Sequence, residues 1–227
     1  MKRFFWYFIN FFGIMKHTNN GGGYNNTLTG GLRMKHCNGN NIPVIIDSIC
    51  FILSKINKAD KIHLIKLVYL ADKYHLMNYG RTITNDNYMA LSHGPVGSIT
   101  MDVLEYDPYV LGEYLDISQS MFVNTHDFEY SLSDQFKIEM LENLSESDIE
   151  ALEFSINNFG NMNKWDVVHY THTLPEWKQY KNHFDQNKIK RADLKTEEVS
   201  STPKDRYFNV PEDHIAQSIE ILNGTFD

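Results

Sequence analysis

The chain has 227 residues, of which 42% are hydrophobic and 13% aromatic, enough for one sizeable core. Five of its 21 basic residues precede the first acidic residue, Asp47, and leave 16 basic against 29 acidic residues in the remainder, a charge of −13. An acidic body repels a phosphate backbone, so the composition argues against nucleic acid and favours a basic protein partner. Cys37 and Cys50, the two cysteines, form no disulfide framework and favour the reducing cytoplasm.

The first residues form a short apolar run, residues 4–14, behind the basic pair Lys2 and Arg3. This run resembles a signal peptide, but it is too short to span a bilayer and no small-residue cleavage site follows it, so we do not expect membrane contact. Residues 16–41 are rich in Gly and Asn and offer little to bury. Residues 1–41 are therefore expected to be a disordered leader, or a non-native one if translation starts downstream.

Two apolar segments predict the helices at the centre of the fold. Residues 43–56 carry the pattern of a largely buried helix. Asp60 is placed to cap a second helix over residues 61–77, which is apolar around most of its circumference and so belongs in the middle of the domain. Gly80 can end this helix in a left-handed turn.

The middle of the chain predicts a small β element. Residues 88–91 should be a short strand, and residues 121–123 and 128–132 should pair as a hairpin. Between them, Ser98 could cap a helix that runs to Tyr106 and is stopped by Asp107 and Pro108.

The remainder of the chain is again helical in pattern. Ser145 and Asp148 imitate a capping box for a helix that ends at Gly160, and shorter helices should follow at residues 163–172 and 175–177. Residues 186–227 read as a polar connection and an amphipathic helix that packs on the domain. We therefore predict a mainly α (α+β) fold, with a compact helical domain over residues 42–185 around a buried central helix and a small hairpin or short sheet.

Ionisable residues inside the apolar helix are the candidates for chemistry. Asp72 and His75 lie three residues apart on one face. A buried carboxylate needs a donor, for which Arg81, His75 and His93 are the candidates. We interpret the group as a polar clamp that ties the helix to two loops; the alternative is a metal-dependent or acid/base hydrolase that uses Asp72, His75 and His93. No nucleophile with a base at fixed spacing stands nearby.

Other motifs give no evidence of a metal or cofactor. The ten histidines include no His-Glu-x-x-His pattern and no carboxylate-rich metal loop. Gly94 and Pro95 lack the lysine of a phosphate loop and read as a rigid corner. We expect His172 to donate to nearby backbone, with Trp177 packed on the core. No catalytic residue, metal ligand or cofactor is assigned.

A set of motif positions runs in order through residues 43–185 and includes Lys66, Leu144, Ser145 and Asp148. Further positions that belong to these motifs, or that we take as structural, are Tyr69, Asp72, His75, Gly80, Arg81, Asp86, Tyr88, His93, Gly94, Pro95, Val96, Thr171, His172 and Trp177. Together the motifs resemble a family, the SocA-like Panacea domain of antitoxins from bacterial and phage toxin–antitoxin pairs.

The resemblance implies a non-enzymatic protein that neutralises a cognate toxin by direct binding. A founding member of the family is described as an adaptor that delivers its toxin to a Clp protease, which makes such a protease a second expected partner. Other members add a helix-turn-helix that binds DNA, but residues 1–41 contain no candidate for one. The resemblance identifies no particular toxin.

Overall fold

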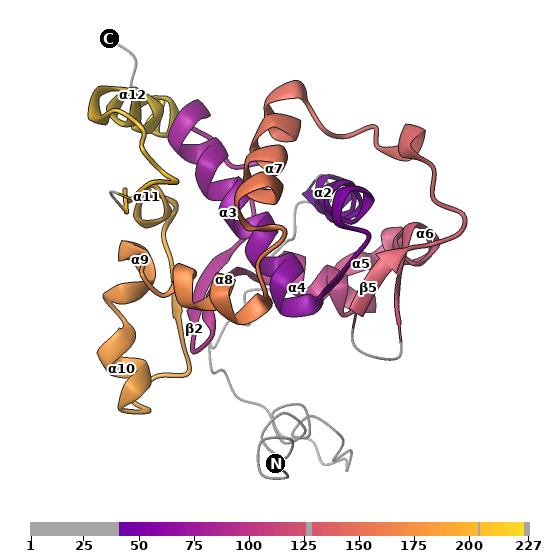
Figure 1. Cartoon of the computed structure of the whole chain (residues 1–227), viewed down its shortest axis with the longest axis horizontal. Helices are drawn as coiled ribbons and strands as arrows, with labels where there is room; N and C mark the ends of the chain where they lie inside the picture. The colour runs from indigo at the N-terminus through magenta and orange to yellow at the C-terminus, as the bar shows by residue number, and fades with distance from the viewer. Residues whose placement is uncertain (1–40, 126–128, 204, 225–227) are drawn as a thin grey trace, which may run out of the picture. The chain divides into compact units, whose positions relative to one another are not determined.

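The computed structural model describes residues 41–125, 129–203 and 205–224 (Figure 1). All of them belong to one compact unit of the chain, His36–Asp227. The expectations for the leader fall outside this range, apart from Asn41, which opens the first described helix.

The helices account for most of the described chain, and the strands are short. The first half contains α2 (Asn41–Ile56), β1 (Lys58–Asp60), α3 (Lys61–Tyr79), β2 (Tyr88–Leu91), β3 (Gly94–Gly97), α4 (Ser98–Leu104), α5 (Pro108–Leu111), the 3-10 helix η1 (Gly112–Tyr114) and α6 (Leu115–Met121). The second half contains β4 (Phe122–Asn124), β5 (Glu129–Leu132), η2 (Ile138–Met140), α7 (Glu146–Phe159), α8 (Lys164–Thr171), α9 (Pro175–Lys178), α10 (Lys181–Asp185), β6 (Arg191–Asp193), α11 (Thr196–Val199) and α12 (Glu212–Asn223). The prediction of a mainly α fold with a small sheet is confirmed.

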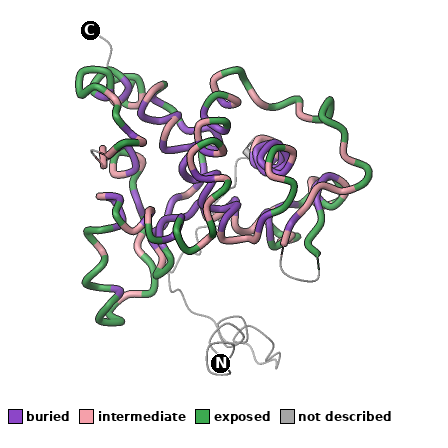
Figure 2. The backbone as a smooth tube through the Cα atoms, in the orientation of Figure 1, coloured by how far each residue is buried: buried purple, intermediate pink, exposed green. Residues whose placement is uncertain are grey.

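Helix α3 is the central element. Every residue from His63 to Lys73 is buried, and α2, α4, α7, α8 and α12 all contact the helix (Figures 1 and 2). Asp60 caps its start by accepting bonds from the backbone N–H groups of Ile62 and His63 at 3.0 and 3.2 Å. Gly80 ends it with φ +69°. Both predicted ends are confirmed, and the helix runs two residues beyond Met77.

The described strands form two three-stranded antiparallel sheets, ordered β1-β5-β4 and β3-β2-β6. Strands β4 and β5 confirm the predicted hairpin, whose connection at residues 126–128 lies outside the described range. The expected rigid corner at Gly94 and Pro95 is wrong, because these residues begin β3 and pair with β2 across the two-residue turn Ser92-His93. Alternating pattern was absent there because all four β3 residues are buried.

Helix α4 receives its cap from a distant carboxylate. The expected cap, Ser98, is instead the first helical residue, and Gly97 occupies the N-cap position with no capping side chain of its own. Asp86 accepts bonds at 2.8 Å from the backbone N–H groups of Ile99 and Thr100. A Cβ on Gly97 would lie 2.3 Å from the Asp86 carboxylate, so glycine makes room for it. The helix ends at Leu104 rather than Tyr106.

Asp107 and Pro108 do not merely stop a helix, as expected from the sequence, but begin the next one. Asp107 accepts bonds from the backbone N–H groups of Tyr109 and Val110, and Pro108 occupies the first turn of α5, where it needs no backbone donor.

The chain beyond Asp185 is more deeply integrated than a polar connection would be. Strand β6 completes a sheet, and the side chains of Val199 and Phe208 are fully buried. Helix α12 lies on α3, where Ser218 donates to the Met77 carbonyl at 2.9 Å. Gly80 permits this close approach, because a Cβ there would lie 2.6 Å from the Ser218 carbonyl oxygen.

The Asp86 cap of α4 is buried and the Asp107 cap of α5 is partly exposed, so their removal should lower stability by different amounts. Asp86→Ala should lower the free energy of unfolding by about 3 kcal/mol, because it leaves buried donors without an acceptor, whereas Asp107→Ala should cost about 1 kcal/mol, because water can replace a partly exposed cap. Urea denaturation of both variants measures the difference. Equal losses would contradict the tertiary cap.

Candidate functional site

Asp72 ties α3 to the segment that follows it. Its side chain is 1% exposed. Oδ1 accepts from the backbone N–H groups of Ile83 and Thr84, both at 2.9 Å, and Oδ2 accepts from the Thr84 hydroxyl at 2.5 Å and the Tyr88 hydroxyl at 2.8 Å. The expected burial is present, but none of the three expected donors is used. Hydroxyl and backbone groups serve instead, because the chain turns back across α3 directly after Arg81.

Burial controls the protonation of this carboxyl group. Removal from water raises the pKa of Asp72 to about 7, against the opposing effect of the hydrogen bonds from Thr84 and Tyr88. The carboxyl is therefore only partly ionised at neutral pH, although all four donor groups of Ile83, Thr84 and Tyr88 are directed at it.

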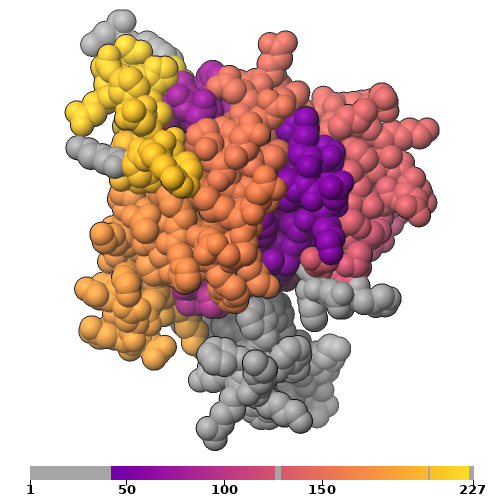
Figure 3. Space-filling model, in the orientation of Figure 1, coloured from indigo at the N-terminus to yellow at the C-terminus, as the bar shows by residue number. Residues whose placement is uncertain are grey.

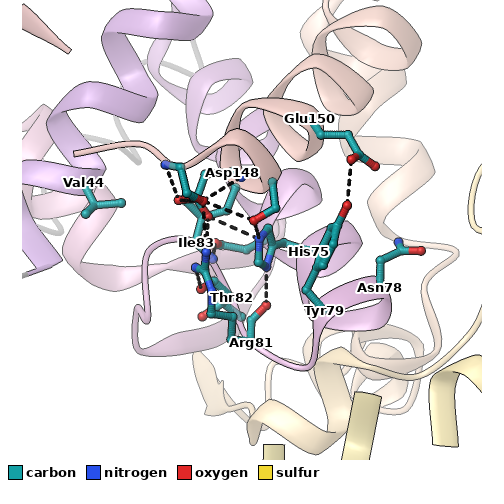
Figure 4. A network of polar contacts seen from close by, with 12 residues as sticks. Val44, His75, Asn78, Tyr79, Arg81, Thr82, Ile83, Asp148 and Glu150 are labelled. Atoms are coloured by element: carbon teal, nitrogen blue, oxygen red, sulfur yellow. Dashed lines mark hydrogen bonds and ion pairs between the residues drawn. The ribbon is translucent and has the colours of Figure 1, made fainter. Parts of the chain in front are cut away.

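Arg81 and His75 instead meet Asp148 at the start of α7 (Figure 4). Asp148 Oδ1 lies 2.9 Å from Arg81 Nη2 and 3.3 Å from His75 Nε2. Its other oxygen accepts from the backbone N–H and hydroxyl of Ser145 at 2.9 and 2.6 Å. The predicted capping box is present and holds Asp148 in place. This carboxylate thus joins the end of α3 to the start of α7.

The His75 ring is bonded at both nitrogens. Nδ1 lies 2.7 Å from the Arg81 carbonyl, which can only accept, so this nitrogen carries the proton. Nε2 lies 3.0 Å from the Ser147 hydroxyl. Burial lowers the pKa of His75 below its ordinary value, which favours the neutral ring with the Ser147 hydroxyl as donor to Nε2. His75 is therefore a positioning group between two helices.

Two lysines of α3 are buried, and Lys66 is one of them. Its Nζ donates to the Pro95 carbonyl at 2.6 Å. Gly94, with φ +101°, brings the β3 backbone onto this ammonium group, and a Cβ there would lie 2.7 Å from both Lys66 Nζ and Thr171 Oγ1. Burial holds the pKa of Lys66 well below its ordinary value.

The second buried lysine, Lys73, joins three distant parts of the chain. Its Nζ lies 3.0 Å from Glu176 Oε1 and donates to the carbonyls of Val199 and Ser201, both at 2.6 Å. Tyr69 donates to the same glutamate oxygen at 2.8 Å. Burial lowers the pKa of Lys73, and Glu176 opposes that effect. The network holds α9, the end of α11 and the segment after it against α3.

We predict no role for Lys66, Lys73 or Glu176 from the sequence. The spacing of Lys66, Tyr69 and Lys73 could have indicated a buried polar network, because an i, i+3, i+7 pattern places them on one face of a helix that is otherwise apolar. Charged residues on a buried face require partners. The sequence could not show which segments provide them.

The remaining motif residues lie around the turn between β2 and β3. His93 is exposed, and its ring centroid is 6.0 Å from that of Trp165. The His172 ring stacks on Trp177 at 3.8 Å, and Trp177 Nε1 donates to the Leu91 carbonyl at 2.7 Å. Trp177 packs on the core as predicted. The expected backbone bond of His172 is wrong for Nε2, which is buried without a hydrogen-bond partner among the described residues.

The structure does not bring Asp72, His75 and His93 together into one cluster. Asp72, His75 and His93 each have a different set of neighbours, and the first two are sealed from solvent. An open pocket of about 360 Å³ lies nearby, but its lining contains none of the three: it consists of Arg81, Thr82, Ile83, Asn85, Thr196 and Leu222. In the part of the chain that the structure describes, no three His, Cys, Asp or Glu side chains are arranged to hold a metal ion.

The comparisons with known proteins identify the family. The model of the antitoxin SocA-like Panacea domain matches residues 64–178, from the first buried turns of α3 to the end of α9. The chain belongs to this family. No curated protein and no solved structure matches it. Over the described residues, no helix has both the length and the apolar character needed to cross a membrane.

The Asp72 clamp predicts a difference between two substitutions. Asp72→Ala should lower the free energy of unfolding by about 3 kcal/mol or more, because four buried donors lose their acceptor. Asp72→Asn keeps one oxygen for the two backbone donors and should cost less. Urea denaturation measures both, and equal losses would show that the bonds contribute little.

The pH dependence of the same variants serves as a control. The pKa of Asp72 is about 7 in the folded protein and close to 3.8 in an unfolded chain, so the native state binds more protons between these values. This group's contribution to stability should therefore fall as pH rises from about 4 to about 7. The difference in unfolding free energy between wild type and Asp72→Asn should change in that window and stay flat above it.

The buried ion pair predicts strong coupling. Lys73→Met or Glu176→Gln alone should cost about 3 kcal/mol or more, because each leaves a buried partner uncompensated. The double variant should cost less than the two losses together, with a coupling energy of about 1 to 3 kcal/mol by double-mutant cycle. The exposed pair Lys181–Asp185 is the control and should couple by less than about 0.5 kcal/mol. Additive losses at Lys73 and Glu176 would contradict the network.

Proposed function

We propose that this protein is an antitoxin that neutralises a cognate protein toxin by direct binding. The observation that carries the proposal is its membership of the SocA-like antitoxin family over residues 64–178. The excess of acidic over basic residues after Asn41 is suited to a basic partner. We place this action in the cytoplasm and assign it no enzymatic step.

The burial of the polar motif residues supports a binding protein over a hydrolase. A general base or acid must come within hydrogen-bond reach of its substrate. Inside the protein, the Asp72 carboxyl instead accepts hydrogen bonds from Thr84 and Tyr88. The His75 ring is bonded to the Arg81 carbonyl and the Ser147 hydroxyl.

Occlusion of the toxin is favoured over its delivery to a Clp-type protease. An adaptor needs a segment that is available to the protease, and by its polar composition the chain after Asp185 is the part best suited to that role. That chain instead supplies β6 to a sheet, and its Val199 and Ser201 carbonyls accept bonds from the buried Lys73. A segment held in this way is poorly suited to engage a second protein.

Co-expression tests the proposal. Induction of the neighbouring small gene should arrest growth, and co-expression of this protein should restore it. Asp72→Asn and His93→Ala should rescue growth as well as wild type does, because neither residue has a catalytic role. Failure of wild type to rescue growth would refute antitoxin function, and loss of rescue in both variants at normal protein levels would favour the hydrolase. Toxin half-life, measured with and without this protein, separates the mechanisms: occlusion leaves it unchanged or longer, and delivery shortens it.

A further inference from the structure

One segment of the chain is strongly acidic and also exposes apolar side chains. Residues 101–142 contain ten acidic residues and a single basic one, Lys137. Two of the acidic residues, Glu105 and Glu129, pair with Lys61 and Lys58 from outside the segment. Within it, Glu113 and Asp116 are exposed and lie in η1 and at the start of α6. Their charges have no nearby basic residue in sequence to balance them, so this part of the surface should attract positive charge.

Large apolar side chains stand out from the same segment. Tyr109 in α5 is 97% exposed, Ile117 in α6 is 48% exposed and Val123 in β4 is 38% exposed. Asp116 and Ile117 follow Glu113 by three and four residues, so both lie next to it along the continuous helical stretch of η1 and α6. Tyr109 precedes this stretch in α5 and Val123 follows it in β4. We call the exposed residues Tyr109, Glu113, Asp116, Ile117 and Val123 together the acidic-apolar face.

The elements that carry this face are firmly held. Leu111, Ser118 and Met121 point the opposite way and are buried. The Tyr106 hydroxyl donates to the Phe122 carbonyl at 2.7 Å, and the two rings stack with centroids 5.4 Å apart. A side chain displayed on a fixed framework loses little additional freedom when a partner covers it.

Tyr109 contributes little to packing within the described chain. The Tyr109 hydroxyl makes no hydrogen bond to a described residue, and its ring contacts almost nothing. Tyrosine is among the residues that most often dominate binding energy at protein interfaces, especially where apolar neighbours exclude water around it. Acidic residues at the rim of such a patch add electrostatic steering and orientation.

We propose that the acidic-apolar face is where the toxin docks, through a basic surface with an apolar pocket that receives Tyr109. This inference rests on the proposed antitoxin function and adds the location and chemistry of the interface. The occupant is the toxin rather than a second copy of this chain, because two copies would bring the same acidic residues together in a symmetric contact. The motif residues lie on other elements and do not touch the partner.

The test uses the full chain and the purified product of the neighbouring gene, with binding measured by titration calorimetry. Tyr109→Ala should weaken the complex at least about tenfold, as expected for a hot-spot residue. Glu113→Gln combined with Asp116→Asn should weaken it less at high salt than at low salt, because these charges act mainly through screened long-range attraction.

Matched controls lie on other elements. Trp165→Ala removes an aromatic side chain that is 47% exposed in α8, and Asp213→Asn with Glu220→Gln removes two exposed charges from α12. Both should leave the affinity within about twofold of wild type. Circular dichroism and urea denaturation should confirm that every variant is folded.

The outcomes separate the two proposals. Tight binding that survives the Tyr109 and acidic substitutions, or that is lost equally in the controls, overturns the assignment of this face while leaving the antitoxin function intact. A neighbouring product that neither binds nor is neutralised overturns both. Self-association that is abolished by Tyr109→Ala, measured by analytical ultracentrifugation without partner, would show that a second copy occupies the face and would also overturn the proposal.

Discussion

Helix α3 is buried from His63 to Lys73, yet this stretch carries Lys66, Asp72 and Lys73. A buried charge without a partner costs several kcal/mol, so each of these groups must be satisfied by atoms brought from elsewhere in the chain. Asp72 is bonded to the segment after Arg81, and Lys66 is bonded to β3. Lys73 is bonded to α9 and to the end of α11. These requirements act together with apolar packing to arrange the elements around α3.

This arrangement accounts for the many ionisable residues of the motif by bonds inside the protein. Their polar atoms face other parts of the same chain: Asp72 faces Thr84 and Tyr88, and Asp148 faces Ser145. Figure 4 shows Asp148 facing Arg81. If the protein acts as proposed above, its outer surface, and not these internal contacts, binds the toxin. Figure 3 shows one side of this surface, with the segments of α7 and α8 beside α2.

Local signals in the sequence were reliable where a few adjacent residues decide the structure. The Asp60 cap, the Gly80 terminus and the Ser145–Asp148 capping box were all predictable, because each depends on contacts within a few positions of the chain. The α4 cap was not, because its carboxylate comes from Asp86, outside the helix. Strand β3 was missed because its four residues are all buried and show no alternation.

The sequence by itself determined the class of fold, the buried character of α3, the positions of its ends and the membership of the family's motif set. It also showed that Asp72 needs internal partners, since a carboxylate inside an apolar helix cannot remain unpaired. Only the tertiary structure decided which residues bond to the buried ionisable groups: Thr84 and Tyr88 bond to Asp72, and Glu176 pairs with Lys73. Partner choice depends on which distant segments the chain's turns bring within about 3 Å, the reach of a hydrogen bond, and no local pattern encodes that proximity.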